Sequence, residues 1–427
     1  MLIVNDDIIM RKKIRYGLII LLMFCAGANT YAQNTSSPYS ILGIGDIEES
    51  FFNRTSGMAN TGIAYRSSYF LISNNPASYS ALQDQFFMVE ASARGKIVSY
   101  YANNLNSTAN QTRDFSVNRV SVGIKVNKWW GSSIGLTPFS TSNYAFSGKK
   151  VIQGTNLFTY ADYEGTGGVN KAYWDNGVRL GKHFSIGVST SFLFGSLNQK
   201  EVLAGTEATS TITTTKNVFL RNLYMSYGAQ YFTKVTSKWD LSLGATYANK
   251  TDLAAEYNTN ITSGTTTIED KVTKNDYFRM PNMYGAGLAI TKNKKLTMLA
   301  DYRYQEWASV KYSGSGYSLR NSSRASIGVE YAKLRQVWPV PIEKVFYQAG
   351  LFYTDSYLSI RNEQLKDMGV SVGLGFHSKR STLSYLVGFE YGIRGTKSQN
   401  LIQERYGKIT LTLSYKDFWY TKGQKYY

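Results

Sequence analysis

Apolar residues alternate with small or polar residues along most of the chain beyond about residue 86. In FSIGVSTSFLFG, residues 184–195, the positions Phe184, Ile186 and Val188 alternate with serine and glycine. TLSYLVGFEYGIRG, residues 382–395, repeats the pattern. Because successive side chains of a strand point to opposite faces, this period of two predicts β-strands with one apolar and one polar face.

A soluble β-sandwich shows the same alternation, but three features favour a transmembrane barrel. The expected strands reach or exceed the ~9–11 residues that cross a bilayer at a tilt. Tyrosine and tryptophan gather near strand ends, where an aromatic girdle meets the membrane interface. Short connections such as NKW, GKH and TSK alternate with longer ones, which we expect at 102–114, 148–169 and 259–269.

We therefore predict an all-β fold, a transmembrane antiparallel β-barrel of about fourteen strands. An even number of strands closes without an unpaired edge and places both termini in the periplasm. The expected strands lie near 87–101, 115–127, 132–147, 170–182, 184–205, 211–233, 238–258, 270–291, 295–313, 321–333, 343–360, 368–378, 381–395 and 404–416.

The barrel is expected to span residues 87–427, and residues 33–86 are expected to fill its lumen. The side chains of so wide a wall cannot reach across it, so the lumen needs a plug or holds water.

Residues 1–32 are predicted to be a removable signal peptide, with basic residues before the short apolar core GLIILLMFCAGA. Small residues before the junction place cleavage between Ala32 and Gln33. Cys25 could signal lipidation, but the preceding Phe24 is not the small residue that such a signal needs. The mature chain has no cysteine, which excludes disulfides and thiolate chemistry.

The full chain carries a net charge of +18, with 47 basic and 29 acidic residues. Such a balance favours anionic partners such as lipopolysaccharide phosphates. Export and the lack of a basic recognition helix argue against nucleic acid. The simplest interpretation of the charge is a solvated basic surface.

Several quoted motifs, taken in order, resemble one known family over nearly the whole mature chain. They are SPYSILGIGD, GMANTGIA, ISNNPASYSAL, GTGGVNKAYWDNGVRLGKHFSIGVSTSFLFGSL, RMPNMYGAGLAI, DYRYQEW, YGIRGTKSQNLIQERY and LSYKDFWYTKGQKYY. The family is the FadL-type outer-membrane transport family, in the form common among Bacteroidetes. It is related to the shuttle barrel of type IX secretion.

The resemblance implies a barrel of fourteen strands plugged by an N-terminal hatch, in which Asn75, Pro76 and Ala77 lie. These three residues either gate the hatch or simply form a turn that ends it. The family also implies an inward kink of the third strand that opens the wall sideways. Pro138, with Thr137 and Phe139, would mark this lateral portal, unless Pro138 lies beyond the membrane at the top of its strand.

Ionisable side chains recur on the face expected to point inward. Their simplest role is structural, as paired charges that hold the hatch or line a wet lumen, and contact with a ligand is the alternative. The inward set is Glu90, Arg94, Asp175, Arg179, Asp301, Arg303, Arg324, Glu330, Glu390 and Arg394.

The mature sequence offers little for catalysis. Its only histidines, His183 and His377, fall in or beside expected periplasmic turns, and neither has a partner at a useful sequence spacing. GIGD and GLGFHS are not phosphate loops, because no strand–loop–helix unit surrounds them. We expect no enzyme activity, no metal site and no cofactor.

Two functions remain. The first is passive uptake of hydrophobic small molecules, such as long-chain fatty acids, across the cell outer membrane, with hatch-gated lateral exit. The alternative is a protein-docking barrel, an accessory subunit of an outer-membrane secretion or assembly machine. The expected partners are outer-membrane lipid and lipopolysaccharide, a hydrophobic ligand and, for the alternative, another outer-membrane or secretion protein.

Overall fold

The computed structural model describes residues 37–103, 111–151, 158–203, 211–310, 313–314, 317–337, 340–378 and 382–418. The predicted signal peptide, with Cys25 and the junction between Ala32 and Gln33, lies outside these residues. No helix in the described part of the chain is long and apolar enough to cross a membrane.

The described chain is almost entirely strand, with five short 3-10 helices. The helices are η1 (Pro38–Ile41), η2 (Arg54–Met58), η3 (Pro76–Ala81), η4 (Trp307–Val310) and η5 (Ser398–Asn400). The strands are β1 (Asp46–Ile47), β2 (Phe86–Tyr101), β3 (Gln111–Lys125), β4 (Trp130–Thr141), β5 (Tyr144–Val151), β6 (Phe158–Leu180), β7 (Phe184–Leu203), β8 (Ile212–Lys234), β9 (Trp239–Ala248), β10 (Thr251–Ser263), β11 (Thr266–Met280), β12 (Met283–Lys292), β13 (Leu296–Gln305), β14 (Ser313–Gly314), β15 (Tyr317–Leu319), β16 (Ser322–Val337), β17 (Val340–Ile360), β18 (Glu363–His377), β19 (Leu383–Arg394) and β20 (Gln403–Phe418).

The strands form a closed antiparallel barrel of fourteen wall strands, as predicted. Three of these wall strands are each divided in two, as β4 with β5, β9 with β10, and β11 with β12. β2 closes the ring by pairing with β3 on one side and β20 on the other. The closing pair runs from Phe86 opposite Phe418 to Tyr101 opposite Gln403. Closure leaves the wall with partners on both sides of this junction.

The period of two in the sequence corresponds to an apolar outer face and a polar inner face. On β20, Ile409 and Leu411 are 50% and 49% exposed on the outside. The intervening Thr410 and Thr412 point inward and are buried. An exposed apolar outer face is what contact with lipid requires.

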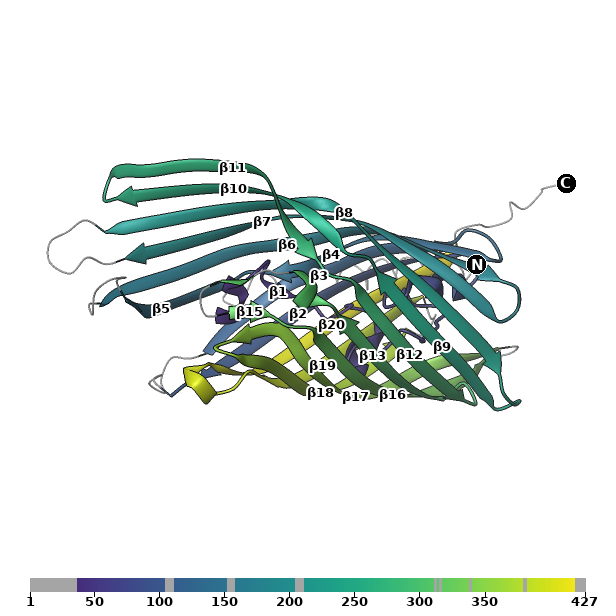
Figure 1. The fold of residues 1–427 in the computed structure, drawn as a ribbon. Helices are drawn as coiled ribbons and strands as arrows, with labels where there is room; N and C mark the ends of the chain where they lie inside the picture. The colour runs from purple at the N-terminus through teal and green to yellow at the C-terminus, as the bar shows by residue number, and fades with distance from the viewer. Residues whose placement is uncertain are drawn as a thin grey trace, which may run out of the picture. The chain divides into compact units, whose positions relative to one another are not determined.

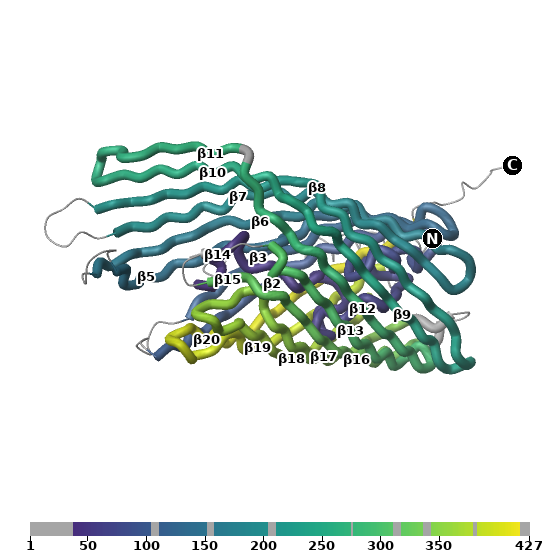
Figure 2. The backbone as a smooth tube through the Cα atoms, viewed as in Figure 1, coloured from purple at the N-terminus to yellow at the C-terminus, as the bar shows by residue number. Residues whose placement is uncertain are grey.

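One sector of the wall continues well beyond the rest (Figure 1). There β5, β6, β7, β8, β10 and β11 run on as a six-stranded sheet, which we call the sheet extension (Figure 2). Among the described strands, β5 pairs only with β6, and along the extension β11 pairs only with β10. The sheet extension therefore has two free edges.

The sheet extension corrects two sequence predictions. Most of residues 148–169 and 259–269, expected to be long loops, belong to strands. The physical reason is that threonine, valine and tyrosine favour strands even where the alternation of apolar and polar residues is weak. Here cross-strand pairing, rather than lipid contact, selects the strand conformation.

The connections at the two ends of the barrel differ. At the end that we call the turn end, β6–β7, β8–β9 and β12–β13 are joined by residues 181–183, 235–238 and 293–295. The opposite end, which carries the sheet extension, is called the hairpin end. The tight connections predicted from NKW, GKH and TSK all lie at the turn end.

Residues 37–85, called here the N-terminal segment, lie against the inner face of the wall. Wall glycines permit this close approach, because a Cβ at Gly187 would lie 2.3 Å from the Ala77 nitrogen. A Cβ at Gly350 would lie 2.5 Å from the Met58 carbonyl carbon. These two glycines belong to β7 and β17, which are far apart around the ring.

A charged substitution on the outer face of the barrel ring should destabilise the protein, whereas one on the sheet extension should not. Val387→Arg, on outward-facing β19, should lower the free energy of unfolding by ~2–4 kcal/mol if it lies near the bilayer midplane. Val151→Arg, 66% exposed on the sheet extension, is the matched control and should change it by roughly 0.5 kcal/mol or less. Unfolding in lipid vesicles measures both, and equal effects would contradict this division of the wall.

Candidate functional site

Asn75 lies against β8 and β9, and Pro76 and Ala77 lie against β6 and β7. The Asn75 side chain caps η3 by accepting a hydrogen bond from the Ala77 nitrogen at 3.0 Å. Its Nδ2 donates to the carbonyls of Ala229 and Ala245, both at 3.2 Å. Pro76 occupies the first turn of η3, where its fixed φ suits the helix and no N–H is needed. This buried corner therefore connects the segment to the wall.

Arg54 of the N-terminal segment forms the most extensive ion-pair cluster of the lumen. Its guanidinium binds both oxygens of Glu330 at 2.8 and 2.9 Å, and both oxygens of Glu343 at 2.8 and 2.9 Å. The Phe346 ring lies 4.0 Å from the guanidinium carbon. Only Glu330 was predicted from the sequence, since Arg54 lies outside the expected strands and a bulge between Glu343 and Val345 shifts the alternation at Glu343.

Two further arginines predicted to face the lumen bind carboxylates of the N-terminal segment. Arg394 binds Asp46 through two hydrogen bonds of 2.8 Å. Arg94 binds Glu48 at 2.6 Å. These pairs hold the stretch around β1 against β19 and β2.

Three other predicted charges bind the backbone of the segment instead. Asp301 accepts from the Gly62 and Ile63 nitrogens at 2.7 and 3.0 Å. Arg303 donates to the Asn60 carbonyl at 3.1 Å, and Arg324 donates to the Ala59 carbonyl at 3.3 Å. The wall thus supplies partners for loop backbone that has no sheet to join.

Of the four remaining predicted charges, Asp175 is buried on β6 and Arg179 lies near the end of the same strand. Glu90 and Glu390 differ in their partners. Glu90 accepts from the Leu71 nitrogen and pairs with Arg119, each at 2.9 Å. Glu390 pairs with Lys408 on the neighbouring strand at 2.8 Å. Arg119 was not predicted, because a bulge in β3 places Asn118 and Arg119 consecutively on the inside.

Near the hairpin end, an apolar cluster fills the lumen. Trp307 is fully buried and stacks on Tyr357 at 4.6 Å between ring centroids. Tyr39 and Ile44 of the N-terminal segment belong to the same cluster, with inward residues of β7, β8, β10 and β11. The inner face, polar in the middle of the barrel, is therefore apolar here.

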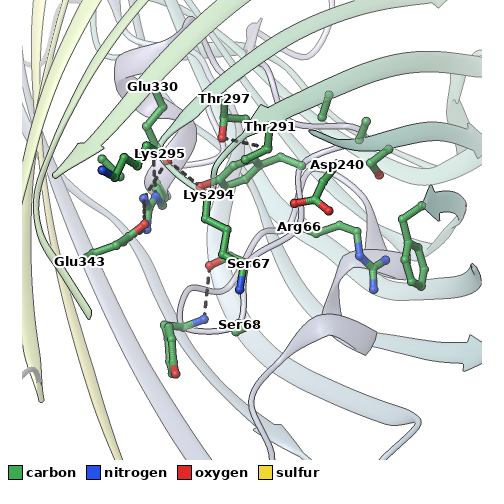
Figure 3. A pocket seen from close by; sticks show the side chains of 18 of the residues that line it. Arg66, Ser67, Ser68, Asp240, Thr291, Lys294, Lys295, Thr297, Glu330 and Glu343 are labelled. Atoms are coloured by element: carbon green, nitrogen blue, oxygen red, sulfur yellow. Dashed lines mark hydrogen bonds and ion pairs between the residues drawn. The ribbon is translucent and has the colours of Figure 1, made fainter. Parts of the chain in front are cut away.

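At the turn end lies an open cavity of about 1030 Å³ (Figure 3). It is bounded by residues 64–69 of the N-terminal segment and by strand ends of the wall. Basic side chains dominate its charged lining, and Lys294 and Lys295 lie beside Ser67 and Thr291 in the view.

The third wall strand bulges beside Pro138 and is divided into β4 and β5 at residues 142–143. β3 and β4 pair only as far as Val120 opposite Leu136. Beyond that pair, β4 continues beside β6 through a bulge between Pro138 and Ser140, and β1 of the N-terminal segment pairs with its other side. The Phe139 ring packs against the apolar cluster, with its centroid 6.1 Å from that of Tyr224.

The sequence spacing indicated no partner for either histidine, but the structure gives His377 two side-chain contacts. Its Nδ1 lies 2.6 Å from Ser384 Oγ, and its Nε2 lies 3.4 Å from Glu343 Oε2. The order resembles a hydrolase triad, but Ser384 is only 3% exposed and does not line the cavity. Glu343 is already bound by Arg54, so the contact has a structural explanation. The described residues contain no cluster of three or more potential metal ligands from histidine, cysteine, aspartate and glutamate.

The Arg54 cluster should be a main source of stability in the lumen. Arg54→Met leaves Glu330 and Glu343 as buried charges without their cation, and should lower the free energy of unfolding by ~3–5 kcal/mol. Lys150→Met, which removes the exposed pair of Lys150 with Glu201, should cost roughly 0–1 kcal/mol. Guanidinium unfolding in detergent, followed by tryptophan fluorescence, compares them. Similar costs would show that the cluster does not anchor the segment.

Solved structures of outer-membrane channels share this fold at low sequence identity. The "CymD monoaromatic hydrocarbon channel" matches with a TM-score of 0.55 at 15% identity, over 89% of this chain and 98% of that chain. The P. putida toluene transporter TodX matches with a TM-score of 0.58 at 16% identity, over 89% and 99%. A Pseudomonas aeruginosa FadL homologue matches with a TM-score of 0.54 at 12% identity, over 86% and 98%. These matches confirm the barrel fold expected from the sequence.

A search of curated proteins found no match. The model of the BamG family, in contrast, matches residues 10–426. Since this match covers nearly the entire sequence, the chain belongs to the BamG family.

Proposed function

We propose that this barrel is a protein-docking subunit of an outer-membrane assembly or secretion machine. The observation that carries the proposal is the sheet extension, with its two free edges. Unpaired N–H and C=O groups along a strand edge are a template for a strand of another protein. The BamG match, which spans nearly the whole chain, also favours a role with protein partners.

The filled lumen supports docking over passage. Opening a path past the N-terminal segment would separate Arg54 from Glu330, Arg394 from Asp46 and Arg94 from Glu48. Removing one partner of a buried ion pair costs ~3–5 kcal/mol, so opening all three exceeds what a weakly bound small ligand supplies. A docking subunit needs no such opening.

We place the turn end and both termini in the periplasm and the sheet extension at the cell surface. Outer-membrane barrels combine tight periplasmic turns with long extracellular connections, which matches the two ends of this wall. Outer-membrane lipid would contact the apolar outer face, and lipopolysaccharide phosphates would face the basic surface. Residues 37–85 act as a hatch that stays in place.

Trimming the β10–β11 hairpin tests docking. Thr259 lies opposite Lys271, so Asn-Gly can replace residues 260–270 as a two-residue turn. Affinity purification from solubilised outer membranes should recover a stoichiometric partner with the wild type and lose it with the trimmed barrel.

The control for this trimming keeps the hairpin and replaces Ser263 and Thr265 by alanine, which should retain the partner. Heat-modifiable migration on gels verifies that each barrel is folded. Recovery of lipid but no protein partner with the wild type would contradict docking.

Uptake of hydrophobic small molecules, such as long-chain fatty acids, is the second candidate. The separation of β3 from β4 beside Thr137, Pro138 and Phe139 favours it, because a gap between paired strands offers a lateral portal. Asn75, Pro76 and Ala77 would then belong to the moving part of the hatch. The structural neighbours include proteins named as a monoaromatic hydrocarbon channel and a toluene transporter.

Pro138→Val tests uptake, because valine can donate to a straight, fully paired strand where proline cannot. If the portal operates, cells producing this variant should lose uptake of a labelled long-chain fatty acid. Pro281→Val, at the junction of β11 and β12, is the matched control and should leave uptake intact. Unchanged uptake in a folded Pro138→Val barrel would exclude the portal.

A further inference from the structure

The cavity at the turn end is strongly cationic (Figure 3). Its charged lining consists of Arg54, Arg66, Arg179, Lys182, Lys234, Lys294, Lys295 and Lys416, with Asp240, Glu330, Glu343 and Asp417. Arg54 forms ion pairs with both Glu330 and Glu343. The other seven cations therefore face only two remaining carboxylates in this cavity.

Arg66 and Arg179 share one aromatic ring in this cavity. Their guanidinium carbons lie 3.8 and 5.3 Å from the centroid of Phe232. Arg66 donates to Ser185 Oγ at 2.9 Å and to Gln230 Oε1 at 2.7 Å, so its position is set by the wall.

Within the described chain, no carboxylate forms an ion pair with Arg66 or Arg179. Burial, and then the neighbouring Arg179 guanidinium, lower the pKa of Arg66 to about 9. Two like charges held together destabilise each other, and an anion placed between them would relieve that cost. Arg66 and Arg179 therefore bring two cations without carboxylate partners in the described chain to the lining of this cavity.

We propose that the turn-end cavity binds an extended acidic peptide segment of a partner protein, with Arg66 and Arg179 as its main contacts. The cations would bind carboxylate side chains, and the apolar lining around Phe86, Phe232 and Leu334 would cover the peptide between them.

The size and position of the cavity favour a peptide over other anions. Its volume of about 1030 Å³ is at the upper end of small-molecule sites, so inorganic phosphate would leave most of the lining uncovered. The acyl chains of a phospholipid would stay against the outer face of the wall, where Tyr231 is exposed. The cavity lies on the inner face, because its lining residue Phe232 points inward.

The inference rests on the proposed docking function, because it assigns the peptide to a partner that reaches the turn end. Its test uses only the purified full-length barrel and synthetic probes. A negative result would therefore leave the trimmed-hairpin experiment unaffected, and loss of the hairpin partner would leave this binding intact.

Fluorescence anisotropy of labelled hexaglutamate with the barrel in detergent tests the site. We expect saturable binding to the wild type that weakens as salt is raised, because salt screens charge pairs. The double variant Arg66→Gln with Arg179→Gln should bind at least about tenfold more weakly, since charge-assisted hydrogen bonds are lost. Lys238→Gln, at the same end but outside the cavity, is the matched control and should bind as the wild type.

Equal binding of hexaglutamine, equal binding by the double variant or no binding at about 1 mM hexaglutamate would each overturn the proposal. Binding of inorganic phosphate or of phosphatidylglycerol vesicles in place of the peptide would assign the cavity to another anion. If the double variant does not fold, Arg179→Gln alone, which changes an exposed side chain, replaces it, and unchanged affinity then overturns the proposal.

Discussion

A polypeptide in lipid finds hydrogen-bond partners only within itself, and this constraint underlies the architecture of the barrel. The wall closes where β2 meets β20, from Phe86 opposite Phe418 onward. A ring of fourteen strands is too wide for its own side chains to fill. The space inside is therefore occupied by the N-terminal segment, and the remaining features of the lumen follow from placing loop backbone there.

Loop backbone inside a barrel needs partners that a sheet would otherwise provide. Asp301 accepts from two consecutive nitrogens of the segment, while Arg303 and Arg324 donate to its carbonyls. The buried charges are thus tied to the conformation of the segment. Because each would be costly without its partner, they also oppose movement of the segment.

The two ends of the lumen have opposite chemistry. Toward the hairpin end, Trp307 and Tyr357 stack in an apolar cluster, and beyond them the wall continues as the sheet extension. At the turn end, Arg66 and Arg179 line an open cationic cavity. A docking subunit with one surface at each end accounts for both features, whereas a hydrophobic channel explains neither the cationic cavity nor the free sheet edges.

The strands and their inner and outer faces could be predicted from the amino-acid pattern, because contact with lipid imposes a strict period of two. Ile409 and Leu411 face outward and Glu330 and Arg394 inward, as the alternation indicated. The turn at Asn75 and Pro76 could also be predicted from the sequence, since proline and asparagine have local backbone preferences.

Where the apolar–polar alternation of the strands ends, and which charged side chains pair, depends on the tertiary structure. Arg119 escaped detection because a bulge in β3 shifts the period locally. Glu343 and Arg54 are distant in sequence, and their pairing depends on how the segment lies against the wall. Within the sheet extension, residues 148–169 and 259–269 were expected to be loops, because their alternation is weak and cross-strand pairing forms the strands there. The alternation of apolar and polar residues reflects the local surroundings of a strand. Ion pairs across the lumen, in contrast, form only once the whole ring has closed.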